Sequence, residues 1–133
     1  MKLTKDNSNL DRNKLAAYVK TISPSAGKKL QALLDKEKEI LEHGNKYGEK
    51  FTARQWDMAV DPIFTAEYER ACILKLTRSE PLSVRQLANK LELPEKQVLQ
   101  HITVLRKRNL IAMHEVKATA PHYLALPEAK KES

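Results

Sequence analysis

The sequence predicts a mainly α-helical protein with a small β-hairpin close to its C-terminal end. Two short amphipathic segments, 83–91 and 94–108, follow one another with a proline-containing break between them. Two β-type segments, 110–114 and 122–126, come next. Before residue 63 most apolar residues recur with helical spacing, so we expect an N-terminal helical segment ahead of a compact C-terminal domain.

The first of the two amphipathic helices has a clear start at Ser83. The Ser83 hydroxyl can accept a hydrogen bond from the backbone N–H of Gln86, whose side chain can return to the N–H of Ser83, and this exchange forms a capping box. Leu82 and Leu87 flank the box in the positions of a hydrophobic staple. Spacings of three and four residues then predict one buried face, formed by Val84, Leu87, Ala88 and Leu91.

A short turn separates this helix from the next. Pro94 has a fixed φ and no backbone N–H, so it suits the first turn of a new helix rather than the interior of an old one. We therefore predict a turn of about three residues, as a helix-turn-helix requires, and a second helix over 94–108. The residues expected to face inward on this helix are Val98, Leu99, Ile102 and Leu105, with Val104 at the edge.

The outward face of the second helix is polar and basic. Gln97, Gln100 and His101 carry the planar hydrogen-bonding groups that address base edges in the major groove of DNA. Arg106 and Lys107, at the other end, are suited to phosphates. A basic C-terminal turn also complements the helix dipole, so a purely solvated face remains the alternative interpretation.

A β-hairpin is expected after this helix. Asn109 can end the helix in the left-handed conformation, and the strands 110–114 and 122–126 are joined across residues 115–121, which include Lys117. Leu82 can add a residue or two of a third strand. Upstream, Thr65 can cap a helix that runs to Arg78 and completes a three-helix core.

The order helix, tight turn, helix, hairpin is that of a helix-turn-helix with a wing, whose second helix can lie in the DNA major groove. Residues 65–126 resemble the ArsR-type branch of the winged helix-turn-helix family, through the phrase LELPEKQVLQHITVLRKRNLIAMHEV. The resemblance implies DNA-facing positions at Lys96, Gln97, Gln100 and His101 and a wing position at Lys117. The chain departs from the family at Leu99, where a small polar residue is frequent, and in lacking the paired cysteines of its metal sensors. The candidate DNA-contacting residues are Arg85, Lys96, Gln97, Gln100, His101, Arg106, Lys107 and Lys117.

Residues 1–62 are expected to form an N-terminal helical region with an interaction or dimerisation role. A short helix ends at Ile22 and a longer one runs over 26–43, with the turn residues 23–25 between them. Thr52 and Gln55 form a second capping box, which starts a short helix that ends near Val60, before Asp61-Pro62. Glu37 interrupts the apolar stripe of the long helix and argues against a long coiled coil. The candidate dimer interface is that stripe, Leu30, Leu33, Leu34, Ile40 and Leu41.

Composition narrows the class of function. The 133 residues carry a formal net charge of +7, which favours a polyanionic partner. No apolar run is long enough to span a membrane, and the single cysteine, Cys72, lies on an apolar helix face, so a cytoplasmic location is expected. Residues 127–133 form a polar tail.

Catalysis and metal binding find little support in the sequence. The chain has only three glycines and no glycine-rich phosphate loop, nor a motif of nucleophile, base and orienting acid, so we expect no enzyme and no cofactor. If residue 115 pairs with residue 121, His114 and His122 become cross-strand neighbours. Zinc requires three or four ligands, so no metal is expected from this pair.

Two functions from different classes remain open. The first is a DNA-binding transcription regulator, as a homodimer, because two-fold pairing supplies a second half-site on double-stranded DNA. The second is a winged-helix module that docks another protein within a larger complex, because a fold does not fix its use.

Overall fold

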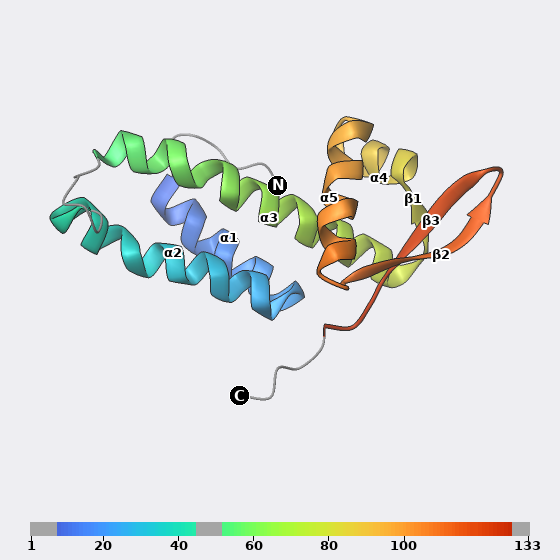
Figure 1. Ribbon diagram of the computed structural model, residues 1–133, viewed down its shortest axis with the longest axis horizontal. Coiled ribbons are helices and arrows are strands. Elements are labelled where there is room, and N and C mark those ends of the chain that lie inside the picture. Colours follow the sequence, from blue (N-terminus) through green and yellow to red (C-terminus); the bar gives the residue numbers. More distant parts are fainter. Residues whose placement is uncertain (1–7, 45–51, 129–133) are drawn as a thin grey trace. The chain divides into compact units, whose positions relative to one another are not determined.

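The computed structural model describes residues 8–44 and 52–128, and only the backbone of residues 8–11 (Figure 1). Residues up to Tyr68 and residues from Glu69 onward form two compact units. The predicted polar tail lies, beyond Glu128, outside the described residues.

The N-terminal unit contains α1 (Ser8–Ile22), α2 (Pro24–His43) and the first part of α3 (Ala53–Ser79). The predicted break between the first two helices is confirmed, and it is limited to Ser23. The helix α2 begins at Pro24 rather than at Ala26, because a proline in the first turn gives up no helical hydrogen bond. A Cβ on Gly27 would lie 2.5 Å from the Cα of Lys20, so the approach of α2 to α1 at this point requires glycine.

The apolar core of this unit differs from the predicted dimer stripe. Leu30 has no exposed surface, which contradicts its predicted place in an interface between two copies of the chain. Leu33, Leu34, Ile40 and Leu41 are half-buried. The residues that form the core are Leu15, Ala16, Val19, Ile22, Ala26, Leu30, Trp56, Val60 and Phe64.

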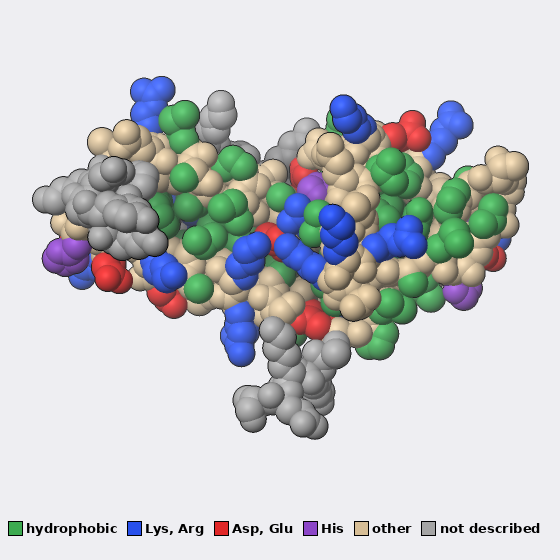
Figure 2. All heavy atoms as spheres, in the orientation of Figure 1, with side chains coloured by type: hydrophobic (Ala, Val, Ile, Leu, Met, Phe, Trp, Pro, Cys, Tyr) green, Lys and Arg blue, Asp and Glu red, His purple; other side chains and the backbone are tan. Residues whose placement is uncertain are grey.

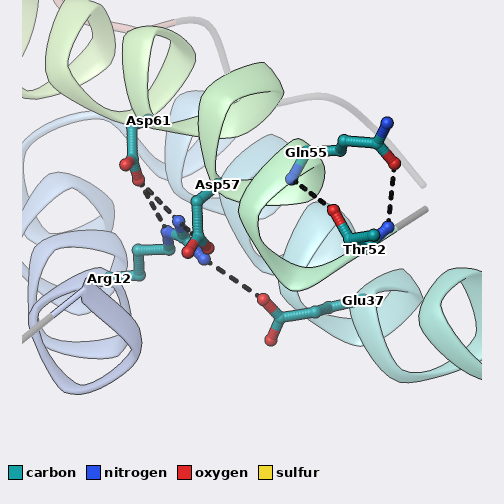
Figure 3. Close-up of polar contacts among 6 residues, drawn as sticks. All are labelled: Arg12, Glu37, Thr52, Gln55, Asp57 and Asp61. Carbon is teal, nitrogen blue, oxygen red and sulfur yellow. Dashed lines mark hydrogen bonds and ion pairs between the residues drawn. The ribbon is translucent and has the colours of Figure 1, made fainter.

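A buried arginine joins the three helices of this unit (Figure 3). Arg12, whose side chain is fully buried, donates hydrogen bonds to Asp57 at 2.6 Å and to Asp61 at 2.6 and 3.0 Å. It also donates to Glu37 at 3.1 Å, which explains the charge inside the apolar stripe of α2. Burial alone would lower the pKa of Arg12, but the hydrogen bonds that it donates to Asp61 and Asp57, and the charges of these carboxylates, outweigh burial and raise that pKa above its ordinary value. The sequence gives no sign that Arg12 is buried, because a lone arginine in a helix predicts a solvated side chain.

Pro62 lies inside α3, which runs without interruption from Ala53 to Ser79. The predicted helix end near Val60 and the predicted new start at Thr65 are therefore wrong. A proline inside a helix costs roughly 3 kcal/mol or more, because it removes one backbone hydrogen bond and crowds the preceding turn. The burial of Val60 and Phe64 on either side of Pro62 offsets that cost.

The predicted capping box at the start of α3 is confirmed. The backbone N–H of Thr52 donates to the Gln55 side chain at 2.9 Å, and the N–H of Gln55 donates to the Thr52 hydroxyl at 3.1 Å (Figure 3). The two bonds satisfy donors that a helix start otherwise leaves without a partner.

The C-terminal unit begins with the last part of α3 and continues through a helix-turn-helix. The elements are β1 (Leu82–Ser83), α4 (Val84–Leu91) and α5 (Glu95–Lys107). The Ser83 capping box is confirmed, with bonds of 2.9 and 3.2 Å to Gln86. Glu92 adopts a left-handed conformation (φ 56°), and a turn of three residues, 92–94, separates α4 from α5, as predicted.

A β-hairpin of β2 (Ile111–Lys117) and β3 (Ala120–Ala125) follows, preceded by Asn109 in the predicted left-handed conformation (φ 59°). The antiparallel sheet has the order β1-β3-β2, which confirms the third strand expected at Leu82. The predicted long loop over 115–121 is wrong, since the strands meet in a two-residue turn at Ala118 and Thr119, both with positive φ. Such a turn favours Asn-Gly, so Ala-Thr gave no signal in the sequence.

The register of the hairpin also separates its two histidines. Met113 pairs with Tyr123 and Glu115 pairs with His122, which leaves His114 as the extra residue of a β-bulge. His114 is exposed, whereas His122 is buried, and its Nδ1 lies 2.9 Å from the carbonyl oxygen of Ala120. The predicted cross-strand pairing of the two histidines is therefore wrong.

The whole is mainly α-helical with a small antiparallel sheet, which confirms the predicted fold class. The core of the C-terminal unit lies between its three helices and the sheet. It consists of Ala71, Ile73, Leu74, Leu82, Leu87, Ala88, Val98, Ile102, Leu105, Leu110, Ile111 and Tyr123.

Candidate nucleic-acid interface

The exposed face of α5 is the main candidate surface. Lys96, Gln100, Arg106 and Lys107 are all exposed on this helix, as predicted from its polar pattern. Their positions follow from the burial of Val98, Ile102 and Leu105 on the opposite side, because a helix turns by 100° per residue. Figure 2 shows Lys and Arg side chains on the viewed face where Figure 1 places α5.

Two residues predicted to contact DNA are instead engaged within the C-terminal unit. The side-chain amide of Gln97 donates to Oε1 of Glu69 at 2.6 Å, and Nε2 of His101 lies 2.8 Å from the same oxygen. His101 is 5% exposed, so its predicted outward orientation is wrong. The physical reason is a partner that helical periodicity cannot reveal. Glu69, on α3, forms a hydrogen bond with the His101 ring, and a polar group can be buried when it has such a partner.

The carboxylate of Glu69 is held in its charged form. Burial alone would raise the pKa of Glu69, but the hydrogen bonds from His101 and Gln97 outweigh it and lower that pKa below its ordinary value. An ionised carboxylate can only accept, so Nε2 of His101 carries the proton of this bond. Nδ1 of His101 is buried and has no hydrogen-bond partner among the described residues. The Glu69 carboxylate thus adds two polar contacts to the apolar contacts of Val98, Ile102 and Leu105, which bury the same side of α5.

Leu99 lies on the exposed face of α5, with 50% of its surface exposed. Its predicted inward orientation is therefore wrong. The buried face of the helix is centred on Val98, Ile102 and Leu105 and extends toward His101, so Leu99 falls on the other side of it. Apolar spacing assigned Leu99 to the core because the sequence does not show whether another part of the chain covers a given leucine.

The remaining candidates lie on neighbouring elements. Arg85 is exposed on α4. Lys117 is exposed at the end of β2, next to the hairpin turn, and its Nζ lies 3.2 Å from Oε1 of Glu115. A surface ion pair of this kind contributes little and is exchanged easily for another anion. The hairpin therefore presents a lysine near its tip.

Other classes of site are not built by the described residues. Among the side chains described, those of 12–44 and 52–128, no three of His, Cys, Asp or Glu are grouped so that they could hold a metal ion. None of the helices in the described ranges combines the length and the hydropathy that crossing a membrane demands.

The comparisons with known proteins address the C-terminal unit. Residues 69–112 match the family model described as "Bacterial regulatory protein, arsR family". No significant match was found among curated proteins or among solved structures. The matched segment covers the end of α3, the helix-turn-helix and the first residues of β2, and domains of this family belong to DNA-binding transcription regulators. The chain therefore carries an ArsR-like winged helix-turn-helix.

Proposed function

We propose that this protein is a transcription regulator that contacts DNA bases in the major groove with the helix 94–108 and the DNA backbone with the wing 110–126. The observation that supports this most directly is the common exposure of Lys96, Gln100, Arg106 and Lys107 on α5. The 13 residues of α5 are about 20 Å long. The major groove, about 12 Å wide, admits a helix.

The roles of the exposed side chains follow from their chemistry. Gln100 can donate and accept at once, as pairing with an adenine edge requires. Lys96, Arg106 and Lys107 supply charge for phosphates on either side of the groove. Arg85 on α4 and Lys117 near the hairpin tip extend the same charge to neighbouring elements.

Gln97 and His101 fit a different role within the same proposal. Both are bound to Glu69, so they hold α5 in place rather than offering their polar groups to bases. We assign them to positioning, and we assign base contacts to Gln100.

The N-terminal region 1–62 is proposed to supply dimerisation and the segment 63–126 to supply DNA binding. One recognition helix contacts few bases, and a second copy placed one DNA turn away, about 34–36 Å, doubles the site. Leu33, Leu34, Ile40 and Leu41 keep part of their surface exposed and form the proposed contact. Light scattering of wild type and Leu34→Glu tests this proposal. A wild-type protein that is monomeric both free and on DNA would contradict the dimer. A Leu34→Glu variant that remains dimeric would show that the interface lies elsewhere.

Binding of the full chain to a random DNA pool over a salt series tests the DNA-binding function. A linear fall of log affinity with log salt is expected. Gln100→Ala should reduce preference for the selected sequence by about 1–3 kcal/mol, whereas Lys117→Ala should weaken all sequences alike and lower the salt slope by about one. Absence of binding at low salt would contradict the proposal and favour the protein-docking module, for which Met113 and Val116 offer exposed apolar surface on β2.

A further inference from the structure

One large apolar side chain stands among the polar and basic residues of the exposed face of α5. Leu99 is 50% exposed, and its neighbours one helical turn away, Lys96 and Thr103, are exposed as well. A single exposed leucine is common on protein surfaces. Leu99, however, lies in the middle of the face of α5 that is proposed to contact DNA, so its side chain can affect what that face binds.

The hydrogen-bonding capacity next to Leu99 is reduced by the helix itself. The hydroxyl of Thr103 donates to the backbone carbonyl oxygen of Leu99 at 2.9 Å, so its hydrogen is already used. Leu99 and Thr103 together therefore offer carbon atoms rather than a donor hydrogen to whatever approaches this part of the helix. An acceptor on a base edge placed here would lose a hydrogen bond to water without regaining one from Thr103, whose oxygen can still accept but not donate.

The charge around Leu99 identifies the kind of partner. Lys96, Arg106 and Lys107 lie on the same face, which suits a polyanion better than the apolar surface of a protein. In the major groove of DNA, the apolar group that the bases expose is the 5-methyl group of thymine. An exposed leucine flanked by phosphate-binding side chains matches that group in size and in polarity.

We propose that Leu99 is a specificity-determining residue that packs against the 5-methyl group of a thymine in the preferred DNA site. The inference rests on the proposed function, because it requires α5 to lie in the major groove. It adds a preference that the hydrogen-bonding side chains of α5 cannot supply. A thymine replaced by deoxyuridine keeps every hydrogen-bonding group and loses only the methyl group, which isolates this contact.

The experiment uses the full chain and the sequence that it enriches from a random DNA pool. Each thymine of that sequence is replaced in turn by deoxyuridine, and the affinities of wild type and Leu99→Ala are measured. At one thymine, wild type should bind the deoxyuridine form about fourfold more weakly, as expected for one methyl group returned to water. Leu99→Ala should bind both forms of that site equally, since a thermodynamic cycle isolates the pair in contact.

The controls separate this contact from folding and from DNA binding in general. Leu99 is exposed, so the melting temperature of Leu99→Ala should equal that of wild type. Met58→Ala removes an exposed apolar side chain from the N-terminal unit and should leave the deoxyuridine effect intact. Sequence-selective binding without any Leu99-dependent deoxyuridine effect would overturn this inference and leave the proposed function standing. Absence of DNA binding would overturn both.

Discussion

Replacing Glu69 tests whether one carboxylate holds the recognition helix in place. Glu69→Ala removes the oxygen that lies 2.6 Å from the Gln97 amide and 2.8 Å from Nε2 of His101. His101 is 5% exposed, so its ring would be left buried without a partner at either nitrogen. A buried polar group without its partner costs about 1–3 kcal/mol, and the half-buried Gln97 can recover part of its loss from water. We expect the C-terminal unit to lose about 2–4 kcal/mol of stability.

Amide hydrogen exchange of α5 measures this loss within the C-terminal unit itself. The slowest amides of α5 should exchange about 30- to 800-fold faster in Glu69→Ala, the ratio that 2–4 kcal/mol gives at 25 °C. Glu69→Gln keeps an acceptor oxygen and should lose less. Glu80→Ala, which removes an exposed carboxylate from the same unit, is the matched control and should change stability by less than about 0.5 kcal/mol. Exchange in Glu69→Ala equal to that of Glu80→Ala would refute the reasoning.

The pH dependence provides a second check on Glu69. Its pKa in the folded protein is lowered, so its contribution to stability is present above the pKa of the unfolded chain, about 4.3, and is lost as pH falls through the lower folded value. The difference in stability between wild type and Glu69→Gln should therefore shrink as the pH falls below about 4. A difference that grows toward acid pH would contradict this sign.

Three further predictions concern other parts of the fold. Gly27→Ala places a Cβ 2.5 Å from the Cα of Lys20 and should lower the melting temperature by forcing α1 and α2 apart, at about 1–3 kcal/mol; an unchanged melting temperature would show that the crossing can relax. Arg12→Met leaves three carboxylates around an uncharged side chain and should lower the free energy of unfolding in urea by about 3 kcal/mol. This loss of stability should be smallest at acid pH, where the carboxylates are protonated, and a stability equal to that of wild type would mean that the cluster repacks. Ser83→Ala removes an observed cap and should cost about 0.5–2 kcal/mol by thermal unfolding. The control Ser79→Ala, at an exposed serine, should change stability by less than about 0.5 kcal/mol, and equal melting curves for the two variants would count against the cap.

Local chemistry determined much of the helix-turn-helix from the sequence. Ser83 with Gln86 and Thr52 with Gln55 form the predicted capping boxes, because each box needs only residues three apart along the chain. The break before Pro94 was equally predictable, since a proline acts on its own backbone and the preceding turn. The exposure of Gln100 followed from the helical period of its neighbours.

The buried polar residues that spacing alone did not reveal depend on partners far along the chain. Glu69 gives the buried His101 ring a polar partner, and Leu99 is exposed because the buried face is centred on Val98, Ile102 and Leu105. Arg12 is buried because carboxylates 25 and more residues away surround it. Pro62 stays inside a helix because Val60 and Phe64 are buried around it.

The sequence by itself therefore determined where α4 and α5 begin, where the turn between them falls and which fold class results, because caps and turns are made by neighbours in the chain. Tertiary structure decided which residues of α5 face outward, since that depends on the burial of Val98, Ile102 and Leu105 and on the Glu69 contacts of Gln97 and His101. It also decided that Leu30 belongs to a core rather than to an interface. Burial depends on which other residues pack against a side chain, and helical spacing identifies an apolar face without showing which part of the protein covers it.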